Sequence, residues 1–259
     1  NWVWDFGGMK RAKTKIDGLS PKAWMDYMFD HTLIVAEDDP YLNAFREMGV
    51  RIEKKNDNLV IFGNGLDSLK KPNNDLYLGN SGTSARLLAG LLATQNFKTT
   101  LTGDKSLSSR PMKRISDPLI SMNAKIETSN GCLPLTIIGS ELSNKVIDIK
   151  IPSAQIKSGL ILAALNTNGL TKIIEHNITR DHTEIMLEAF NADIKISYNE
   201  NKKIIEINGK KELNSKDIIV PSDLSSSSFF IVASLLHKNS KILLKNININ
   251  PTRNGILIA

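Results

Sequence analysis

Three short stretches of small polar residues each run directly into an apolar segment of helical length, and the three stretches are evenly spaced. The polar stretches are residues 81–84, 153–155 and 225–228, and the apolar segments are residues 85–93, 156–165 and 229–236. The interval from Ser81 to Ser153 equals the interval from Ser153 to Ser225. This spacing indicates that one supersecondary unit is repeated. Since the three helices are apolar nearly all round, we expect them to be buried.

The starts of these helices are candidate anion sites. A helix N-terminus presents unpaired backbone N–H groups at the positive end of the helix dipole, and small side chains let an anion approach them. We therefore expect the three helix starts to line one anion-binding cleft. For the start at Gly82 alone, an ordinary Ser or Thr cap beside a glycine turn explains the same residues, and the local pattern favours that simpler interpretation.

A second repeated motif consists of a helix end followed by an alternating strand. Gly49, Asn123 and Asn191 stand at the predicted helix ends, where glycine and asparagine are the usual terminators. Return strands that close on glycine predict three hairpins, at residues 59–63, 135–139 and 204–209. Further strands are predicted at residues 99–103 and 171–175. The sequence thus predicts an α/β fold of repeated βαβαββ units.

Composition excludes several classes of protein. The chain has 259 residues and 41% hydrophobic residues, which is enough for one large or two ordinary domains. A single cysteine, Cys132, excludes a disulfide framework and a cysteine-rich metal site, and it favours a reducing, cytoplasmic setting. No apolar run approaches the roughly 20 residues of a membrane helix, so no membrane partner is expected. The net charge of +6 is spread along the chain and aromatic residues make up 6%, so nucleic acid is not an expected partner either.

Arg110 is a candidate anion ligand on a loop. Pro111 is predicted in the first turn of a helix, which places Arg110 directly before that helix. A planar guanidinium there suits a carboxylate or a phosphate, because it donates paired hydrogen bonds.

Five motifs in order along the chain make the pattern specific. They are Asn80-Ser81-Gly82-Thr83, Gly103-Asp104 with Leu107 and Arg110-Pro111-Met112, Ser153-Ala154-Gln155-Ile156-Lys157-Ser158, Thr179-Arg180-Asp181-His182-Thr183-Glu184, and Asn250-Pro251-Thr252-Arg253-Asn254-Gly255. From about Leu33 to Ala259 the chain resembles the 5-enolpyruvylshikimate-3-phosphate (EPSP) synthases, or 3-phosphoshikimate 1-carboxyvinyltransferases. Within that family it looks most like the bacterial class that is comparatively insensitive to glyphosate.

The resemblance implies a transferase of the shikimate pathway, which leads to chorismate and the aromatic amino acids. The family transfers the enolpyruvyl group of phosphoenolpyruvate to the 5-hydroxyl of shikimate 3-phosphate and releases phosphate. Both substrates are polyanions, in agreement with the helix starts described above. The implied fold is an inside-out α/β barrel with helices inside and sheets outside. We further predict a cytoplasmic monomer that uses no metal and no cofactor.

The resemblance assigns substrate contacts to six residues, which are Gly82, Arg110, Ser153, Ala154, Gln155 and Arg180. Gly82 and Arg110 would contact phosphoenolpyruvate, and the other four would bind shikimate 3-phosphate, with Gln155 reaching both substrates. His182 could act as a base, but the residues around it favour a satisfied polar turn.

The chain also departs from the family. The family opens with a Lys-Ser-x-Ser-x-Arg motif, but one repeat before Ser81 this chain reads Met9-Lys10-Arg11-Ala12-Lys13. We therefore expect residues 1–32 to be an atypical segment, residues 33–216 to form a domain of repeated units, and residues 217–259 to begin a second domain. The family's catalytic Asp and Glu would follow Ala259, so no catalytic residue is identified, and the chain is expected to be an incomplete fragment that is inactive alone.

Other interpretations stay open. The chain could be a non-catalytic anion-binding module, or a scaffold fragment without activity. A structural relative of the family, UDP-N-acetylglucosamine enolpyruvyl transferase, carries a reactive cysteine before its Arg-Pro. Residues 105–109 contain no cysteine and Cys132 lies in a predicted hairpin, so this relative is the less favoured interpretation.

Overall fold

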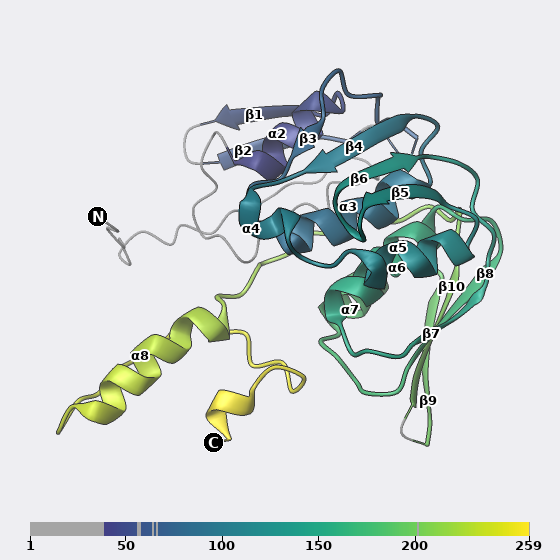
Figure 1. The fold of residues 1–259 in the computed structure, drawn as a ribbon. Coiled ribbons are helices and arrows are strands. Elements are labelled where there is room, and N and C mark those ends of the chain that lie inside the picture. The colour runs from purple at the N-terminus through teal and green to yellow at the C-terminus, as the bar shows by residue number, and fades with distance from the viewer. Residues whose placement is uncertain (1–38, 56–57, 64, 66, 201, 259) are drawn as a thin grey trace.

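The computed structural model describes residues 39–55, 58–63, 65, 67–200 and 202–258 (Figure 1). The atypical segment predicted for residues 1–32 lies outside them. The described chain begins with a helix and a hairpin, α2 (Pro40–Glu47), β1 (Arg51–Lys55) and β2 (Asn58–Phe62). None of the described helices combines the length and the hydrophobicity that a membrane crossing requires.

Two units of the same topology follow. The first consists of β3 (Leu76–Tyr77), α3 (Gly82–Ala93), β4 (Lys98–Thr102), the short α4 (Lys105–Ser108), α5 (Lys113–Ser121), β5 (Lys125–Ser129) and β6 (Cys132–Ile138). The second consists of β7 (Val146–Ile149), α6 (Ala154–Leu165), β8 (Leu170–Glu175), α7 (His182–Ala189), β9 (Ile194–Asn199) and β10 (Lys202–Asn208). The strand orders are β3-β4-β6-β5 and β7-β8-β10-β9, with one parallel pair in each sheet. The predicted βαβαββ organisation is thus confirmed for these two units.

The helices that precede the hairpins end as predicted. Two positions beyond α2, α5 and α7 stand Gly49, Asn123 and Asn191, with φ angles of 82°, 76° and 57°. Glycine and asparagine tolerate this left-handed conformation, which turns the chain out of the helix. Each helix therefore leads directly into its hairpin.

The core lies between the two four-stranded sheets. Helices α3 and α6 are buried over nearly their whole surface, and Figure 1 shows them inside, with the sheets outside. Their backbones touch, because a Cβ built on Gly90 would lie 1.9 Å from the carbonyl oxygen of Gly159. The inside-out α/β arrangement and the burial of these two helices are therefore confirmed.

The glycines that close two of the return strands have a packing role. A Cβ on Gly139 would lie 2.0 Å from the carbonyl oxygen of Gln95, and one on Gly209 would lie 2.1 Å from that of Thr167. Gln95 and Thr167 occupy equivalent positions, just after the ends of α3 and α6. In both units the end of the hairpin thus rests directly on the backbone that follows the core helix.

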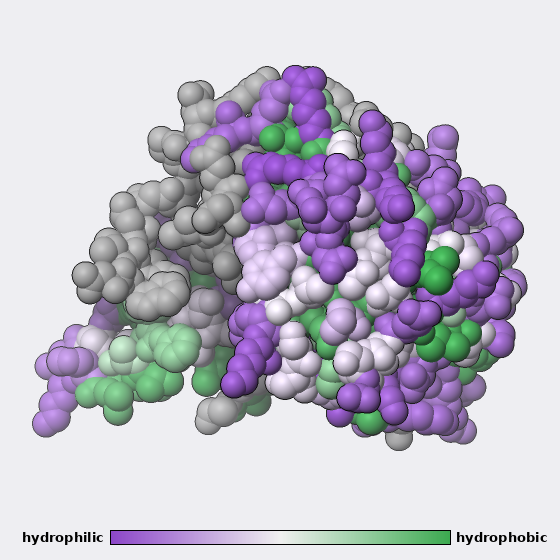
Figure 2. Space-filling view, turned by 45° about the horizontal axis from the view of Figure 1, so that its top comes forward, coloured by the Kyte–Doolittle hydropathy of each residue, from purple (hydrophilic) through white to green (hydrophobic). Residues whose placement is uncertain are grey.

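The third repeat helix departs from the prediction in two ways. Helix α8 (Leu224–Leu236) is capped by Asp223, whose carboxylate accepts a hydrogen bond from the Ser226 N–H over 2.9 Å, so it begins before the predicted Ser225. Several of its apolar residues are also exposed rather than buried, Phe229 by 77% and Leu235 by 79%. Helices α3 and α6 pack against one another. Helix α8, by contrast, packs extensively against no other helix or strand of the described residues. It projects from the body in Figure 1 and carries an apolar surface in Figure 2.

Candidate functional site

Two guanidinium groups converge over the first residue of α3. The helix begins at Gly82 because the Ser81 hydroxyl caps it, accepting a hydrogen bond from the Ser84 N–H over 3.1 Å. A Cβ built on Gly82 would lie 2.8 Å from Nη1 of Arg86 and 3.1 Å from Nη1 of Arg110. The missing side chain thus leaves room for both cations beside the backbone N–H groups of the helix start.

Arg110 is held from one side by Asn80, on the loop before α3, and by Ser106 in α4. Its guanidinium donates hydrogen bonds to Oδ1 of Asn80 and, over 3.3 Å, to the Ser106 hydroxyl. The amide of Asn80 in turn donates to Asp104 over 2.8 Å. The Leu107 N–H and then the Asn80 amide lower the pKa of Asp104, so this carboxylate stays ionised. The first two sequence motifs therefore form one connected group.

The predicted setting of Arg110 needs one correction. Helix α5 begins at Lys113, so Pro111 precedes that helix instead of lying in its first turn. Met112 takes the capping position without a side-chain hydrogen bond, which moves the helix start two residues further along the chain. Arg110 accordingly lies on the link between α4 and α5.

Arg86 belongs to the site, although it was not among the residues predicted from the sequence. Its Nη1 donates to Oε1 of Gln155 over 2.7 Å, and Nε2 of Gln155 donates to the Thr83 hydroxyl over 2.7 Å. Burial, and then the charges of Arg110 and Arg114, lower the pKa of Arg86, so positive charge is concentrated here. Arg86 lies four positions after Gly82, so the two residues share one face of α3. An anion bound beside Gly82 would relieve the repulsion between these cations.

Three of the four residues predicted to bind shikimate 3-phosphate stand at the start of α6. Ser153 caps this helix by accepting a hydrogen bond from the Ile156 N–H over 3.4 Å, and Ala154 and Gln155 form its first turn. Because Gln155 bonds to Thr83, the N-termini of α3 and α6 lie side by side. The structure therefore brings two of the three predicted helix starts into direct contact.

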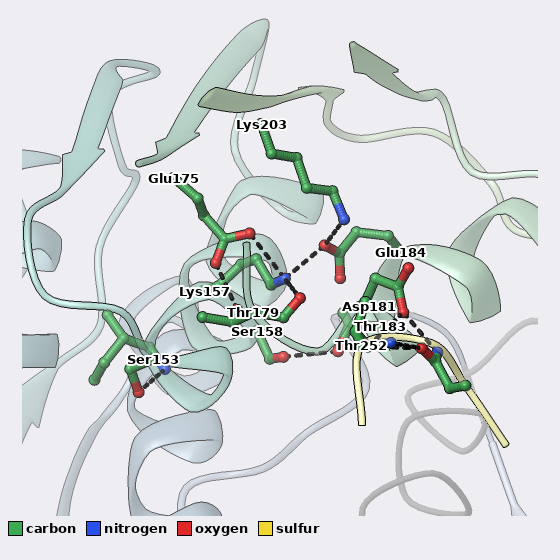
Figure 3. A network of polar contacts seen from close by, with 12 residues as sticks. Ser153, Lys157, Ser158, Glu175, Thr179, Asp181, Thr183, Glu184, Lys203 and Thr252 are labelled. Atoms are coloured by element: carbon green, nitrogen blue, oxygen red, sulfur yellow. Dashed lines mark hydrogen bonds and ion pairs between the residues drawn. The ribbon is translucent and has the colours of Figure 1, made fainter. Parts of the chain in front are cut away.

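A buried ion-pair network lies one turn further along α6 (Figure 3). The Nζ atom of Lys157 contacts Glu175 over 3.0 Å and Glu184 over 2.7 Å, and Glu184 also pairs with Lys203 over 2.9 Å. Each of the four side chains is at most 1% exposed. Burial alone would lower the pKa of Lys203, but the charge and hydrogen bond of Glu184 raise it overall. This network was not predicted from the sequence, where its signal was a lysine inside an otherwise apolar helix.

Arg180 lies on the loop that joins β8 to α7, next to this network. Asp181 follows it and accepts a hydrogen bond from the Asn250 amide over 2.7 Å, and the same amide nitrogen lies 3.2 Å from Nδ1 of His182. Burial would raise the pKa of Asp181, but the Asn250 hydrogen bond and the charge of Lys203 lower it overall. His182 is the first residue of α7, and its Nδ1 contacts the Asn250 amide.

The third helix start is connected to this loop through residues 250–253. Arg253 pairs with Asp223 over 2.7 Å and donates to the Ser225 hydroxyl over 2.7 Å, both at the start of α8. Asn250, three residues earlier, reaches Asp181. The start of α8 is therefore linked to the Arg180 loop by a turn, whereas the starts of α3 and α6 contact one another directly.

Taken together, the site offers helix N-termini and guanidinium groups, which bind carboxylates and phosphates. Among the described residues, no group of three or more His, Cys, Asp and Glu side chains is arranged to hold a metal ion. The site as described is thus equipped to bind anions.

Comparisons with known proteins agree on one family. The family model for EPSP synthase (3-phosphoshikimate 1-carboxyvinyltransferase) matches residues 32–259. The chain is 50% identical over 217 residues to the 3-phosphoshikimate 1-carboxyvinyltransferase of Ruthia magnifica, covering 83% of the chain and 49% of that relative. It is 44% identical over 257 residues to the enzyme of the same name from Streptococcus gordonii, covering 97% of the chain and 56% of that relative.

A solved structure gives the same result. The chain matches the 2.37 Å structure of EPSP synthase from Acinetobacter baumannii with a TM-score of 0.77 and 39% identity, over 96% of the chain and 59% of that structure. The chain spans about half the length of the curated relatives that it matches.

Proposed function

Because the chain belongs to the EPSP synthase family, we propose that it forms the anion-binding part of an active site that transfers the enolpyruvyl group of phosphoenolpyruvate to shikimate 3-phosphate. The observation that carries this proposal is the convergence of Arg86 and Arg110 over Gly82, beside the adjoining starts of α3 and α6. Two polyanionic substrates need two neighbouring groups of hydrogen-bond donors, and we assign one group to the start of α3 and the other to the start of α6.

Phosphoenolpyruvate is assigned to the start of α3. Its carboxylate or phosphate would lie beside Gly82, where the guanidinium groups of Arg86 and Arg110 and the helix N-terminus all offer hydrogen bonds. Arg110 is already held in place from the other side by Asn80 and Ser106, so little side-chain entropy is lost when it binds an anion.

Shikimate 3-phosphate is assigned to the start of α6 and the loop before α7. Ser153, Ala154 and Gln155 would hold it at the helix N-terminus, and Arg180 would bind from the neighbouring loop. Gln155 links the two assignments, because its amide already reaches Thr83 and Arg86 at the phosphoenolpyruvate side.

The proton transfers of the reaction need a general acid and base, and we assign these to the part of the family's length that the chain does not match. The chain by itself is then expected to bind substrate without turnover. We also propose a cytoplasmic monomer that works without a cofactor.

A titration of the full 259-residue chain with shikimate 3-phosphate tests the proposal. Arg180→Ala should weaken binding roughly tenfold or more, because a charged hydrogen bond is worth about 1.5–3 kcal/mol. Arg51→Ala is the matched control, since Arg51 lies on β1 against the ring of Phe62 and should leave binding unchanged. Equal affinity of the wild type and Arg180→Ala would remove Arg180 from the site.

Two further outcomes judge the function itself. If inorganic phosphate binds the chain as tightly as shikimate 3-phosphate does, the chain is only a general anion-binding module. Residues 33–259, joined to the opening segment and to the unmatched half of the Streptococcus gordonii relative, should release phosphate from the two substrates together. Substrate-dependent release by the chain alone would contradict the division of roles proposed here.

A further inference from the structure

We propose that the buried network of Lys157, Glu175, Glu184 and Lys203 is a positioning device for Arg180. It holds the loop of residues 176–181 against the first turns of α6, so that Arg180 and the α6 N-terminus can bind the same substrate. The inference rests on the proposed function for the identity of that substrate, which is shikimate 3-phosphate.

The contacts of Lys157 connect the two parts of the assigned site. Lys157 lies one helical turn after Ser153, and its Nζ reaches Glu175 and Glu184, with the carbonyl oxygen of Thr179 at 3.5 Å (Figure 3). Glu175 is the last residue of β8, and Glu184 lies in the first turn of α7. One ammonium group on α6 therefore contacts both ends of the loop and its middle.

A second contact fixes the loop next to Arg180. The Thr179 hydroxyl donates a hydrogen bond of 2.5 Å to Oε1 of Glu175, while Oε2 of the same carboxylate accepts from Lys157. Both the backbone and the side chain of Thr179 are thus tied to the network. Since Arg180 is the next residue, the direction in which the chain leaves Thr179 sets where Arg180 begins.

The first unit shows that the fold does not need these charges. Ala85 is the fourth residue of α3 and Lys157 is the fourth residue of α6, which makes Ala85 the counterpart of Lys157. The strand pairings of Leu135 with Leu101 and of Ile205 with Ile173 align the hairpins, which makes Leu133 the counterpart of Lys203. Ala85 and Leu133 are buried apolar residues in a unit with the same strand order.

Stability is therefore a weak explanation for the network. Buried ion pairs can often be replaced by well-packed apolar residues without loss of stability, and the first unit is built in that way. Unlike apolar contacts, ion pairs and hydrogen bonds are directional, so they fix the orientation of the groups that they join. The charged network occurs in the unit whose loop carries Arg180, where direction matters for binding.

Variants of Thr179 test the inference in the full chain. Thr179→Val removes the hydroxyl, so the affinity for shikimate 3-phosphate should fall at least fivefold and amide hydrogen exchange should quicken within residues 176–181. Thr179→Ser restores the hydroxyl and should bring the affinity back to within twofold of the wild type. A hydroxyl that served only the stability of the fold would lower the melting temperature when removed, without weakening the binding of shikimate 3-phosphate.

Ser158→Ala is the matched control. Its hydroxyl lies 2.7 Å from that of Thr183, so this variant also removes a buried hydrogen bond between α6 and the segment that follows β8, but it does not touch the loop. It should lower the melting temperature while keeping the affinity within twofold. The inference fails if Thr179→Val binds like the wild type, or if Ser158→Ala weakens binding equally. If the wild type does not bind shikimate 3-phosphate, the proposed function of the chain fails, and the exchange of residues 176–181 still decides whether the network holds the loop.

Discussion

Replacing Gly82 by alanine separates the anion site from the stability of the fold. The new Cβ would lie 2.8 Å from Arg86 and 3.1 Å from Arg110, and both distances are shorter than the 3.4 Å at which ordinary contact begins. Both obstacles are the far ends of flexible side chains, so they can move aside. The cost therefore falls on the position of the two guanidinium groups, and not on the backbone.

The expected magnitudes follow from these contacts. Alanine is favoured over glycine within a helix by roughly 0.5–1 kcal/mol, so the melting temperature should stay level or rise by about 2 °C. Displacing one charged donor from the anion costs about 1.5–3 kcal/mol, so the affinity for phosphoenolpyruvate should fall between about tenfold and a hundredfold. Thermal unfolding and calorimetric titration with phosphoenolpyruvate, in the presence of shikimate 3-phosphate, measure the two effects separately.

Gly90→Ala is the matched control, because it makes the same replacement in the same helix. Its Cβ would lie 1.9 Å from the carbonyl oxygen of Gly159, and this backbone atom moves only if α3 and α6 separate. Overpacking of this kind costs about 1–3 kcal/mol, or roughly 2–10 °C in melting temperature. The reasoning is refuted if Gly82→Ala lowers the melting temperature as much as Gly90→Ala does, or if it binds phosphoenolpyruvate as tightly as the wild type.

Three other contacts each lead to a prediction. Arg110→Ala in the joined, active protein should raise the Michaelis constant for phosphoenolpyruvate about tenfold and that for shikimate 3-phosphate much less, and the reverse pattern would exchange the two assignments. Gly209→Ala should lower the melting temperature by roughly 2–10 °C, because its Cβ would lie 2.1 Å from the Thr167 carbonyl oxygen, and an unchanged melting temperature would contradict the packing. Burial alone would raise the pKa of Asp223, but Ser226 and Arg253 lower it overall, so its ionised form stabilises the fold above its ordinary pKa and this contribution is lost as the pH falls through the lowered value. Asp223→Asn should therefore make helical circular dichroism less dependent on pH between about 5 and 2, and identical acid titration curves would exclude this role.

The elements that could be predicted from the sequence are those whose causes are local. Gly49, Asn123 and Asn191 end their helices because a left-handed residue is needed two positions beyond each helix. Hairpin strands alternate with period two whatever lies beneath them, so their pairing could also be predicted. Ser81 and Ser153 cap their helices through hydrogen bonds that span three residues. In each case all the interacting groups fall within one short window of the chain.

The candidate site could be predicted only in part, because its remaining residues interact across the repeat. Arg86 reaches Gln155 in the next unit, 69 residues away, and Lys157 meets Glu184 on another helix. Residues that interact over such long separations in the chain produce no local pattern of hydrophobic and polar positions from which the contact could be predicted. One signal was nevertheless available. A helix that is apolar on every face has no solvent side for a lysine, so Lys157 required a buried partner of opposite charge.

Helix α8 shows that an apolar helix sequence predicts that the helix requires an apolar partner surface, but does not predict which surface that is. Helices α3 and α6 meet that requirement in two ways: Gly90 and Gly159 let their backbones touch, and the sheets and α5 cover their other faces. Helix α8 has an equally apolar sequence, yet Phe229 is 77% exposed. Burial is a property of a pair of surfaces, and a repeat in the sequence specifies only one surface at a time. The periodicity could therefore predict where the third helix lies along the chain, while its environment depends on which surface packs against it.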